Sequence, residues 1–429
     1  MQPVRTHRFG GLLRQRDFRL FWVGASVSEV GNALAVVAMP LLVVTVLDAD
    51  VFTVGLLTAF AFLPWLLISL PAGAWIDRLP PRRVMVVSDL ASGISYASIP
   101  VAAWLDILTI EYVLAIALSA GIANVFFDTA YQVELANIVA KPDLVEGNTK
   151  LQASVSFSRL GGSSLGGLVV QAIGAASALL VNALSFFVSM ACLLRLEHPG
   201  RAGNENPTRK PDVLRSIAEG ARFVVQDPYF RPLTIWAAVS NFGLTGHDAL
   251  IVVFLVRDVG LGPELIGVLM AAGGIGAVAG TLVAGRLVRR FGTSRGLLVC
   301  STFIIPFVML IPLTDPGTGL GFYVAGIMLC VIGIAITNVI VASFRQSYSP
   351  EGMLGRITAT TRFLLNGSYP VGALAAGALG TWIGTRGALW IMLGFVAFAG
   401  VLLLTPTFLR RRDLPGQDPA MAPARDIGE

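Results

Sequence analysis

The sequence predicts an all-α membrane protein with twelve transmembrane helices in two similar six-helix halves. Three observations predict this fold class. Of the 429 residues, 55% are hydrophobic and only 13% are charged; apolar segments of membrane-spanning length recur along the chain; and two loop motifs repeat at nearly one offset. Soluble domains carry about 25% charged residues, so about half of the expected water-facing charge is missing. A soluble multidomain enzyme, a disordered chain and a disulfide scaffold are therefore excluded.

Apolar windows that fit a membrane-spanning helix lie near 19–46, 52–75, 84–105, 110–133, 152–172, 176–196, 232–256, 263–287, 296–314, 319–343, 358–382 and 387–409. The connections are short except at 197–231, which is polar at first and amphipathic from 213 to 225. We therefore expect four parts: an N-terminal half at 1–196, a cytoplasmic central loop with an amphipathic helix at 197–231, a C-terminal half at 232–409 and a cytoplasmic tail at 410–429.

Lys and Arg are concentrated at both termini and in the even-numbered loops, whereas the odd-numbered loops hold only Arg257 and Arg386. The positive-inside rule then places both termini and the central loop in the cytoplasm, as expected for a multi-pass protein of the bacterial inner membrane. We expect the net charge of +5 to reflect this orientation and contact with anionic lipids. Nucleic acid is not an expected partner, because the basic residues form no contiguous face.

Two loop sequences repeat between the halves. The segment 73–83 follows the second span and resembles 285–295 after the eighth, 212 residues later. The segment 142–147 follows the fourth span and resembles 350–355 after the tenth, 208 residues later. Two correspondences at nearly the same offset predict parallel six-helix repeats.

The first of these loops is similar to the Gly-x-x-x-Asp-Arg-x-x-x-Arg-Arg motif of the major facilitator superfamily, with Gly73, Asp77, Arg78, Arg82 and Arg83 at its positions. Further segments resemble the drug:proton antiporter branch that includes macrolide and enterobactin exporters, at 16–22, 70–89, 126–132, 146–148, 182–186, 256–260 and 355–356. The resemblance implies the major facilitator fold and a secondary active transporter. It implies no cofactor, with the proton gradient as the source of energy.

The resemblance also implies a cytoplasmic gate. Asp77 is expected to meet the N-terminal end of the eleventh span near Ile357, where free N–H groups and the helix dipole favour a carboxylate. The arginines of the motif are expected to pair with Glu134 at the end of the fourth span. The second loop has Arg289 in place of the acidic residue, so we expect an asymmetric gate. The predicted gating residues are Gly73, Asp77, Arg78, Arg82, Arg83, Asp89, Glu134, Gly285, Arg289 and Arg290. A basic loop that only sets the topology is the alternative.

Pairs of glycines four residues apart predict close helix packing, because they leave a helix face without side chains. They are Gly162 with Gly166, Gly276 with Gly280, and Gly380 with Gly384. In the fifth and eighth spans the resemblance implies a sliding seam between the halves, and ordinary tight packing is the alternative.

Glu29 is the sharpest functional signal, because a charge inside the membrane is costly unless it is paired or hydrated. It lies about ten residues into the first span, about 15 Å deep, near the midplane where such transporters bind substrate. Asn32 follows on nearly the same face. Burial favours the protonated form of a carboxyl, so we expect Glu29 to bind a proton or a cationic substrate. A polar contact between helices is the alternative.

Other polar residues within the predicted spans are candidates for the same cavity: Asp128, Arg159, Asn241, His247, Asp248, Asn338 and Arg362. For Asp128 and Arg159, a structural ion pair is favoured over substrate contact. His247 and Asp248 fall in the outer half of the seventh span, where a polar pair lining the vestibule is favoured over proton coupling.

These features predict a transporter and not an enzyme. We expect it to export an amphipathic small molecule, such as a drug, antibiotic or secondary metabolite, by proton antiport with alternating access, as a monomer in the lipid bilayer. A siderophore exporter or nutrient importer of the same fold is the alternative. A polytopic membrane enzyme is more distant, because three histidines offer little material for a catalytic or metal site, and a sensor is more distant because the 35-residue central loop is too small for an effector domain. No Gly-x-x-x-x-Gly-Lys-Ser/Thr loop is present, so ATP is not the expected source of energy.

Overall fold

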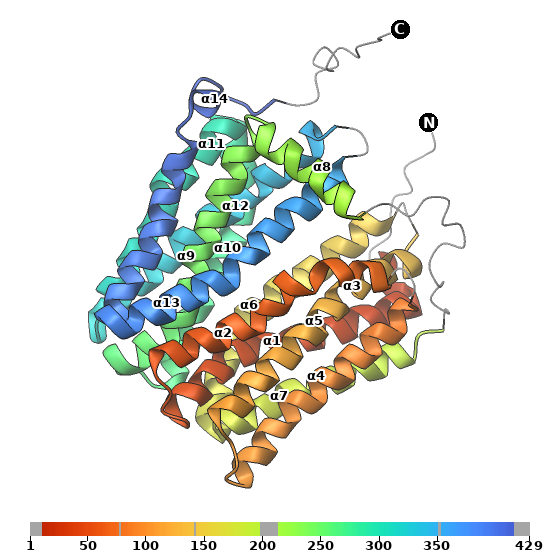
Figure 1. Cartoon of the computed structure of the whole chain (residues 1–429), viewed down its shortest axis with the longest axis vertical. Helices are drawn as coiled ribbons and strands as arrows, with labels where there is room; N and C mark the ends of the chain where they lie inside the picture. Colours follow the sequence, from red (N-terminus) through yellow and green to blue (C-terminus); the bar gives the residue numbers. More distant parts are fainter. Residues whose placement is uncertain (1–10, 77–78, 141–142, 198–212, 351–352, 416–429) are drawn as a thin grey trace. The chain divides into compact units, whose positions relative to one another are not determined.

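The structure, a computed structural model, describes residues 11–76, 79–140, 143–197, 213–350 and 353–415. These residues form helices and no strand. The first half contains α1 (Arg16–Thr45), α2 (Val51–Leu67), α3 (Ser69–Ile76), α4 (Pro81–Trp104), α5 (Ile110–Ile138), α6 (Leu144–Ile173) and α7 (Ala175–Leu194). The central loop contains α8 (Val213–Gln226), which covers the predicted amphipathic segment. The second half contains α9 (Phe230–Val253), α10 (Pro263–Phe291), α11 (Thr293–Val299), α12 (Leu320–Tyr348), α13 (Leu354–Ala399) and α14 (Pro406–Leu409), with 3-10 and π-helical turns between α11 and α12 (Figure 1).

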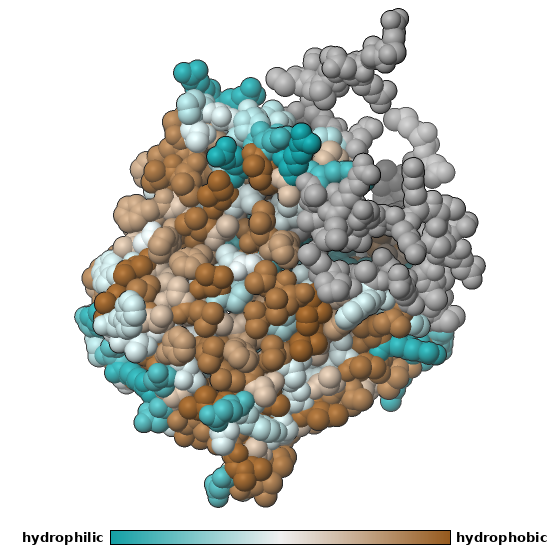
Figure 2. Space-filling model, viewed as in Figure 1, coloured by the Kyte–Doolittle hydropathy of each residue, from teal (hydrophilic) through white to brown (hydrophobic). Residues whose placement is uncertain are grey.

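Nine helices of the described residues are long and apolar enough to cross a membrane. The shorter α2 and the more polar α6 occupy two further predicted spans, and a kink at Gly384 divides α13 into two arms. The helices therefore cover every predicted span, which is consistent with a count of twelve. Figure 2 shows hydrophobic residues over much of the visible helix surface. Such an exposed apolar surface suits contact with lipid.

The two halves repeat at the level of their turns. In the described residues, backbone with positive φ recurs in pairs 210 to 212 residues apart: Asp48 with Gly260, Asp106 with Gly317, and Gly174 with Gly384. The members of each pair follow the first and seventh, third and ninth, and fifth and eleventh predicted spans. Positive φ is uncommon for residues other than glycine. Its recurrence at matched positions confirms the predicted pseudo-symmetric halves.

Contacts divide the chain into two compact units. Unit 1 comprises Met1–Thr208, Thr245–Gly274 and Tyr369–Leu389, and unit 2 comprises Arg209–Leu244, Ile275–Ser368 and Trp390–Glu429. In unit 1, α1 packs against α6 and α7, α4 packs against α5 and α7, and α2 packs against α5 (Figure 1). The same unit includes the parts of α9 and α10 next to the loop that joins them, and the part of α13 around its kink. These parts lie next to odd-numbered loops, and we call this side of unit 1 its odd-loop end. Unit 1 therefore contains segments from both halves of the sequence.

The predicted glycine faces behave differently from one another. A Cβ at Gly162 would lie 2.5 Å from the Ala33 side chain, and one at Gly276 would lie 2.6 Å from the Met328 carbonyl oxygen, so both glycines allow close helix contacts. The expectation is wrong for Gly384, where no atom lies within 4 Å of the position of a Cβ. Gly384 has φ 78° and ψ 162°, a conformation that is open essentially to glycine alone, and it forms the turn between the arms of α13.

Candidate functional site

A cavity of about 730 Å³ lies inside unit 1. Its walls come from α1, α2, α4, α5, α6 and α7 and from the parts of α9 and α10 that belong to this unit. Apolar side chains form much of the wall, among them Met39, Phe62, Trp65, Phe127, Phe186 and Met270. A cavity of this size and lining is typical of a site for a small organic molecule.

The polar lining of the cavity is acidic. Four carboxyl side chains line it, and no Lys, Arg or His stands among its described lining residues: the four are Glu29, Asp89, Asp128 and Asp248. The predicted partner of Asp128, Arg159, lies on α6, and its side chain falls outside the described part of the structure. Carboxyl groups of one sign between low-dielectric walls produce a potential that attracts cations.

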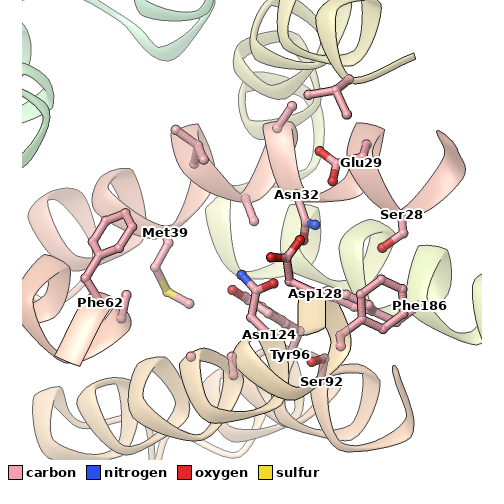
Figure 3. A pocket seen from close by; sticks show the side chains of 18 of the residues that line it. Ser28, Glu29, Asn32, Met39, Phe62, Ser92, Tyr96, Asn124, Asp128 and Phe186 are labelled. Carbon is pink, nitrogen blue, oxygen red and sulfur yellow. The ribbon is translucent and has the colours of Figure 1, made fainter. Parts of the chain in front are cut away.

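Glu29 and Asp128 approach the same space from different helices. Glu29 and Asn32 project from α1, and Asp128 projects from α5 (Figure 3). Both carboxyls are partly exposed to the cavity. The structure thus brings together three of the residues that the sequence predicted for the site. Whether they bind a proton or a substrate stays a prediction.

Other polar side chains of the cavity were not predicted from the sequence. Asn124 lies four residues before Asp128 on α5, and Ser92 and Tyr96 lie on α4 opposite them (Figure 3). The spacing of Asn124 from Asp128 was a usable signal, because residues four apart share a helix face. Ser92 and Tyr96 gave no such signal, because they lie among many small and aromatic residues of a predicted span.

Asp89, which the motif predicted as a gating residue, also lines the cavity. It lies on α4, eight residues after the helix begins at Pro81, and is 1% exposed. Neither of its carboxylate oxygens has a hydrogen-bond partner among the described residues. The Ser189 side chain of α7 lies beside the carboxyl, but no hydrogen bond of ordinary length joins them.

His247 and Asp248 form a pair at the α9 wall. His247 is 3% exposed, and its Nδ1 lies 2.9 Å from Oδ1 of Asp248, whose side chain is 72% exposed. The other ring nitrogen of His247, Nε2, has no hydrogen-bond partner among the described residues. Asp248 lines the cavity, whereas His247 is not among its described lining residues. The role of the pair in proton coupling stays a prediction.

The predicted gating residues are only partly described. Asp77 and Arg78 fall outside the described residues, so the contact of Asp77 with the helix end near Ile357 stays a prediction. Arg82 donates from Nη2 to the Leu194 carbonyl oxygen at 2.5 Å, and the buried Glu134 accepts a hydrogen bond from Asn137 at 3.3 Å. In the described structure Glu134 therefore accepts from an amide of its own helix, and Arg82 is near enough to interact electrostatically with its carboxyl, while no ion pair joins the two.

The remaining candidates lie elsewhere in the chain. Gly73 lies in α3, and Gly285, Arg289 and Arg290 form the exposed end of α10. Asn241, Asn338 and Arg362 belong to unit 2. Their relation to the cavity of unit 1 stays a prediction.

Close contacts join the two halves of the sequence at the odd-loop end of unit 1. A Cβ at Gly55 would lie 2.7 Å from the Ala373 carbonyl oxygen and 2.9 Å from Cα of Gly377. A Cβ at Gly167 would lie 2.5 Å from the Pro263 carbonyl oxygen and 2.8 Å from Cα of Gly267. Arg257 donates from Nη2 to Oδ1 of Asp48 and to the Ala49 carbonyl oxygen, both at 2.9 Å. We call these three groups of contacts the outer seam, after the side of the membrane on which the sequence predicts the odd-numbered loops.

The sequence matches the family model of the Major Facilitator Superfamily over residues 21–369. The chain therefore belongs to this superfamily. It is a multi-pass membrane transporter and not an enzyme, and proteins of this superfamily generally need no cofactor.

Among its relatives is the multidrug efflux pump Tap of Mycolicibacterium fortuitum, 26% identical over 407 residues, which cover 92% of this chain and 97% of the relative. Tap of Mycobacterium tuberculosis strain H37Rv is also 26% identical, over 91% of this chain and 93% of the relative.

Solved structures share the fold. The nucleoside transporter NupG has a TM-score of 0.71 at 13% identity, covering 90% of this chain and 97% of its own. A bacterial homologue of the iron transporter ferroportin has a TM-score of 0.71 at 16% identity, and the match covers 91% of this chain and 98% of the homologue.

Proposed function

We propose that the protein exports an amphipathic organic cation from the cytoplasm in exchange for protons. The observation that carries the proposal is the acidic, aromatic-walled cavity of unit 1, with four carboxyls and no described cationic side chain in its lining. The multidrug efflux pumps among its relatives, which are similar over nearly their whole length, support the same function.

The cavity has the chemistry that such a molecule needs. Phe62, Trp65 and Phe127 offer flat apolar surface to its hydrophobic body and π faces to its cationic group. Met39 and Met270 adapt their flexible side chains to different shapes, which suits a site with broad specificity. The carboxyls supply the charge that a buried cation requires.

The same carboxyls couple export to proton entry. A proton bound at one of these carboxyls removes negative charge from the cavity and so weakens the attraction of the cavity for the cationic substrate. Proton binding therefore promotes substrate release, and substrate binding promotes proton release. This competition drives export when protons are more concentrated outside the cell.

Transport requires the cavity to open to the two sides of the membrane in turn. We place this motion between the two six-helix halves, 1–196 and 232–409, with the outer seam closing the external side. Both termini and the central loop lie in the cytoplasm of a bacterial cell, as the distribution of Lys and Arg indicates. The working unit is a monomer in the inner membrane, with protons and the small molecule as its partners and no nucleic acid.

The alternative from the sequence, a siderophore exporter, has less support when the siderophore is an anion. Its substrate would have to enter a cavity whose carboxyl groups repel it. A nutrient importer of the same fold has no observation in its favour among the described residues.

Inside-out membrane vesicles with an imposed proton gradient test the proposal, with the fluorescent organic cation ethidium as the probe. We expect gradient-dependent uptake of ethidium in the wild type and a loss of about tenfold or more in Glu29→Gln, because a charge-assisted contact contributes about 1.5–3 kcal/mol. Glu111→Gln is the matched control, since Glu111 is an exposed residue at the start of α5.

Three outcomes contradict the proposal. Uptake that persists without a proton gradient refutes proton coupling. Uptake of anionic but not cationic probes refutes the substrate class, and unchanged uptake in Glu29→Gln refutes the role of that carboxyl.

A further inference from the structure

Asp89 differs from the other carboxyls of the cavity. Glu29 and Asp128 are partly exposed, and each interacts with other residues. Asp248 has a largely exposed side chain and an interaction with His247. Asp89 is 1% exposed and has no hydrogen-bond partner for either oxygen among the described residues.

Asp89 also differs from the buried carboxyls that have a structural role in unit 1. Asp17 is 9% exposed and accepts a hydrogen bond from the Glu197 backbone N–H at 3.3 Å. Glu134 is 1% exposed and accepts from Asn137. Buried acids that hold a fold together are satisfied in this way, since an unsatisfied buried polar group is costly. The Asp89 carboxyl has no such partner to account for its burial.

Asp89 lies both at the wall of the cavity and at the contact between α4 and α7. Asp89 lines the cavity from α4, and Ser189 of α7 lies beside its carboxyl. The helices α4 and α7 pack along each other, and Tyr96 of α4 stacks on Phe186 of α7 at 5.8 Å between ring centroids. A change in the charge of Asp89 therefore acts on the junction between α4, α7 and the cavity.

The two charge states of Asp89 suit different surroundings. The protonated acid is neutral and fits a buried site, whereas the carboxylate needs water or a cation. The charged and titratable side chains on the helices around it, apart from those in the first turn of α1 and of α5, are Glu29 on α1, Arg82, Arg83 and Tyr96 on α4, Asp128, Tyr131 and Glu134 on α5, and Cys192 and Arg195 at the end of α7. Arg82 donates to the Leu194 carbonyl oxygen, and no ion pair joins Arg82 or Arg83 to Asp89 in the described structure.

We propose that Asp89 is the proton-binding carboxyl of the cavity, while Glu29 and Asp128 face the transported cation. This division rests on the proposed antiport function and assigns its two ligands to separate carboxyls. In the closed, buried state Asp89 holds the proton. When the cavity hydrates the α4–α7 junction, the O–H bond of Asp89 breaks, the proton passes to water and the carboxylate remains.

Proton uptake by the purified protein tests this assignment without any substrate. Detergent-solubilised wild type and Asp89→Asn are shifted from alkaline to mildly acidic pH, and the protons taken up are counted with a pH-indicator dye. We expect Asp89→Asn to take up about one proton fewer per molecule, because the amide does not titrate. Equal counts in the two proteins overturn the proposal.

Matched variants separate a lost proton site from a lost fold. Asp106→Asn makes the same substitution in an exposed residue just after α4, where the φ of 55° is tolerated by asparagine, and is expected to leave the count unchanged. Asp89→Glu keeps a carboxyl and is expected to restore the count. Asp89→Ser gives the same readout as Asp89→Asn if the amide prevents folding, and monodispersity in size-exclusion chromatography reports the fold of each variant.

Ethidium separates this proposal from the proposed function. In proteoliposomes, Asp89→Asn is expected to retain ethidium binding and ethidium exchange without a gradient, and to lose accumulation driven by a proton gradient. Glu29→Gln is expected to lose binding. Gradient-driven accumulation in Asp89→Asn at the wild-type level overturns the assignment of Asp89. Absence of ethidium binding in the wild type instead overturns the proposed substrate class, while the proton count still decides the role of Asp89.

Discussion

At the scale of single residues, hydrogen-bond partners separate Asp89, the proposed proton-binding carboxyl, from other buried carboxyls of unit 1. Asp17 and Glu134 accept hydrogen bonds, whereas Asp89 has no partner in the described structure. The sequence indicated Glu29 and Asp128 because a charge in an apolar span is costly. For Asp89 the sequence indicated only a gating motif. It could not show that Asp89 is buried beside a cavity, because that burial depends on how α4 packs on α5 and α7.

Asp227 illustrates a structural carboxyl in unit 2. Its Oδ1 accepts hydrogen bonds from the backbone N–H groups of Tyr229 and Phe230, both at 2.8 Å, and its Oδ2 accepts from the Tyr348 hydroxyl at 3.1 Å. We expect Asp227→Ala to lower the free energy of unfolding by about 2 kcal/mol, because it removes a helix cap and a side-chain hydrogen bond.

The thermal unfolding midpoint of the purified protein measures this effect. Asp227→Asn is the control, and we expect a smaller loss because the amide oxygen still accepts from the backbone. An unchanged midpoint in Asp227→Ala contradicts the assigned capping role.

At the scale of elements, glycine sets how closely helices from the two halves approach within unit 1. The spacing of glycines predicted close helix packing, and Gly162 and Gly276 confirm it, but each meets a helix of its own half, Ala33 of α1 and Met328 of α12. At these two glycines the contact is therefore ordinary tight packing and not the predicted seam between the halves. The sequence did not predict Gly55, because glycine spacing reports a bare face on one helix and not the neighbour that approaches it. At Gly55 that neighbour is the backbone of α13.

We expect Gly55→Val to prevent closure of the outer seam, because a Cβ would meet backbone atoms of Ala373 and Gly377 that no side-chain rotation moves away. Gradient-driven ethidium uptake should fall about tenfold or more, as the cavity can no longer close on that side. The access of a membrane-impermeant thiol reagent to a cysteine placed at Thr58, which lines the cavity, should rise.

Gly161→Val is the control for this change, because no atom lies within 4 Å of a Cβ at Gly161. We expect it to leave thiol access unaltered. Normal uptake and unaltered thiol access in Gly55→Val rule out a closing role for the outer seam.

At the scale of the whole molecule, the chain is a repeat whose halves use the same turns. Gly174 has φ 82° and ψ 158°, and Gly384, 210 residues later, has φ 78° and ψ 162°. Both conformations are open essentially to glycine alone. No atom lies within 4 Å of a Cβ at either position, so the backbone conformation alone requires glycine.

We therefore expect Gly174→Ala and Gly384→Ala to destabilise the protein by similar amounts, about 1–3 kcal/mol each. Thermal unfolding midpoints of the single variants and the double variant measure this effect. Gly321→Ala is the control: it lies in α12 with open space around it, and alanine there should be neutral or stabilising. A loss in only one of the two variants contradicts the equivalence of the turns.

The sequence by itself determined the class of protein, the membrane-spanning segments and the repeat. It could do so because a helix in lipid must satisfy its backbone hydrogen bonds within itself, so length and hydropathy specify each span locally. Tertiary structure alone decided which polar side chains share the cavity, which glycines touch a neighbouring backbone and which buried carboxyl lacks a partner. Those properties depend on the rotation and packing of each helix against the others, and no local pattern in the chain encodes them.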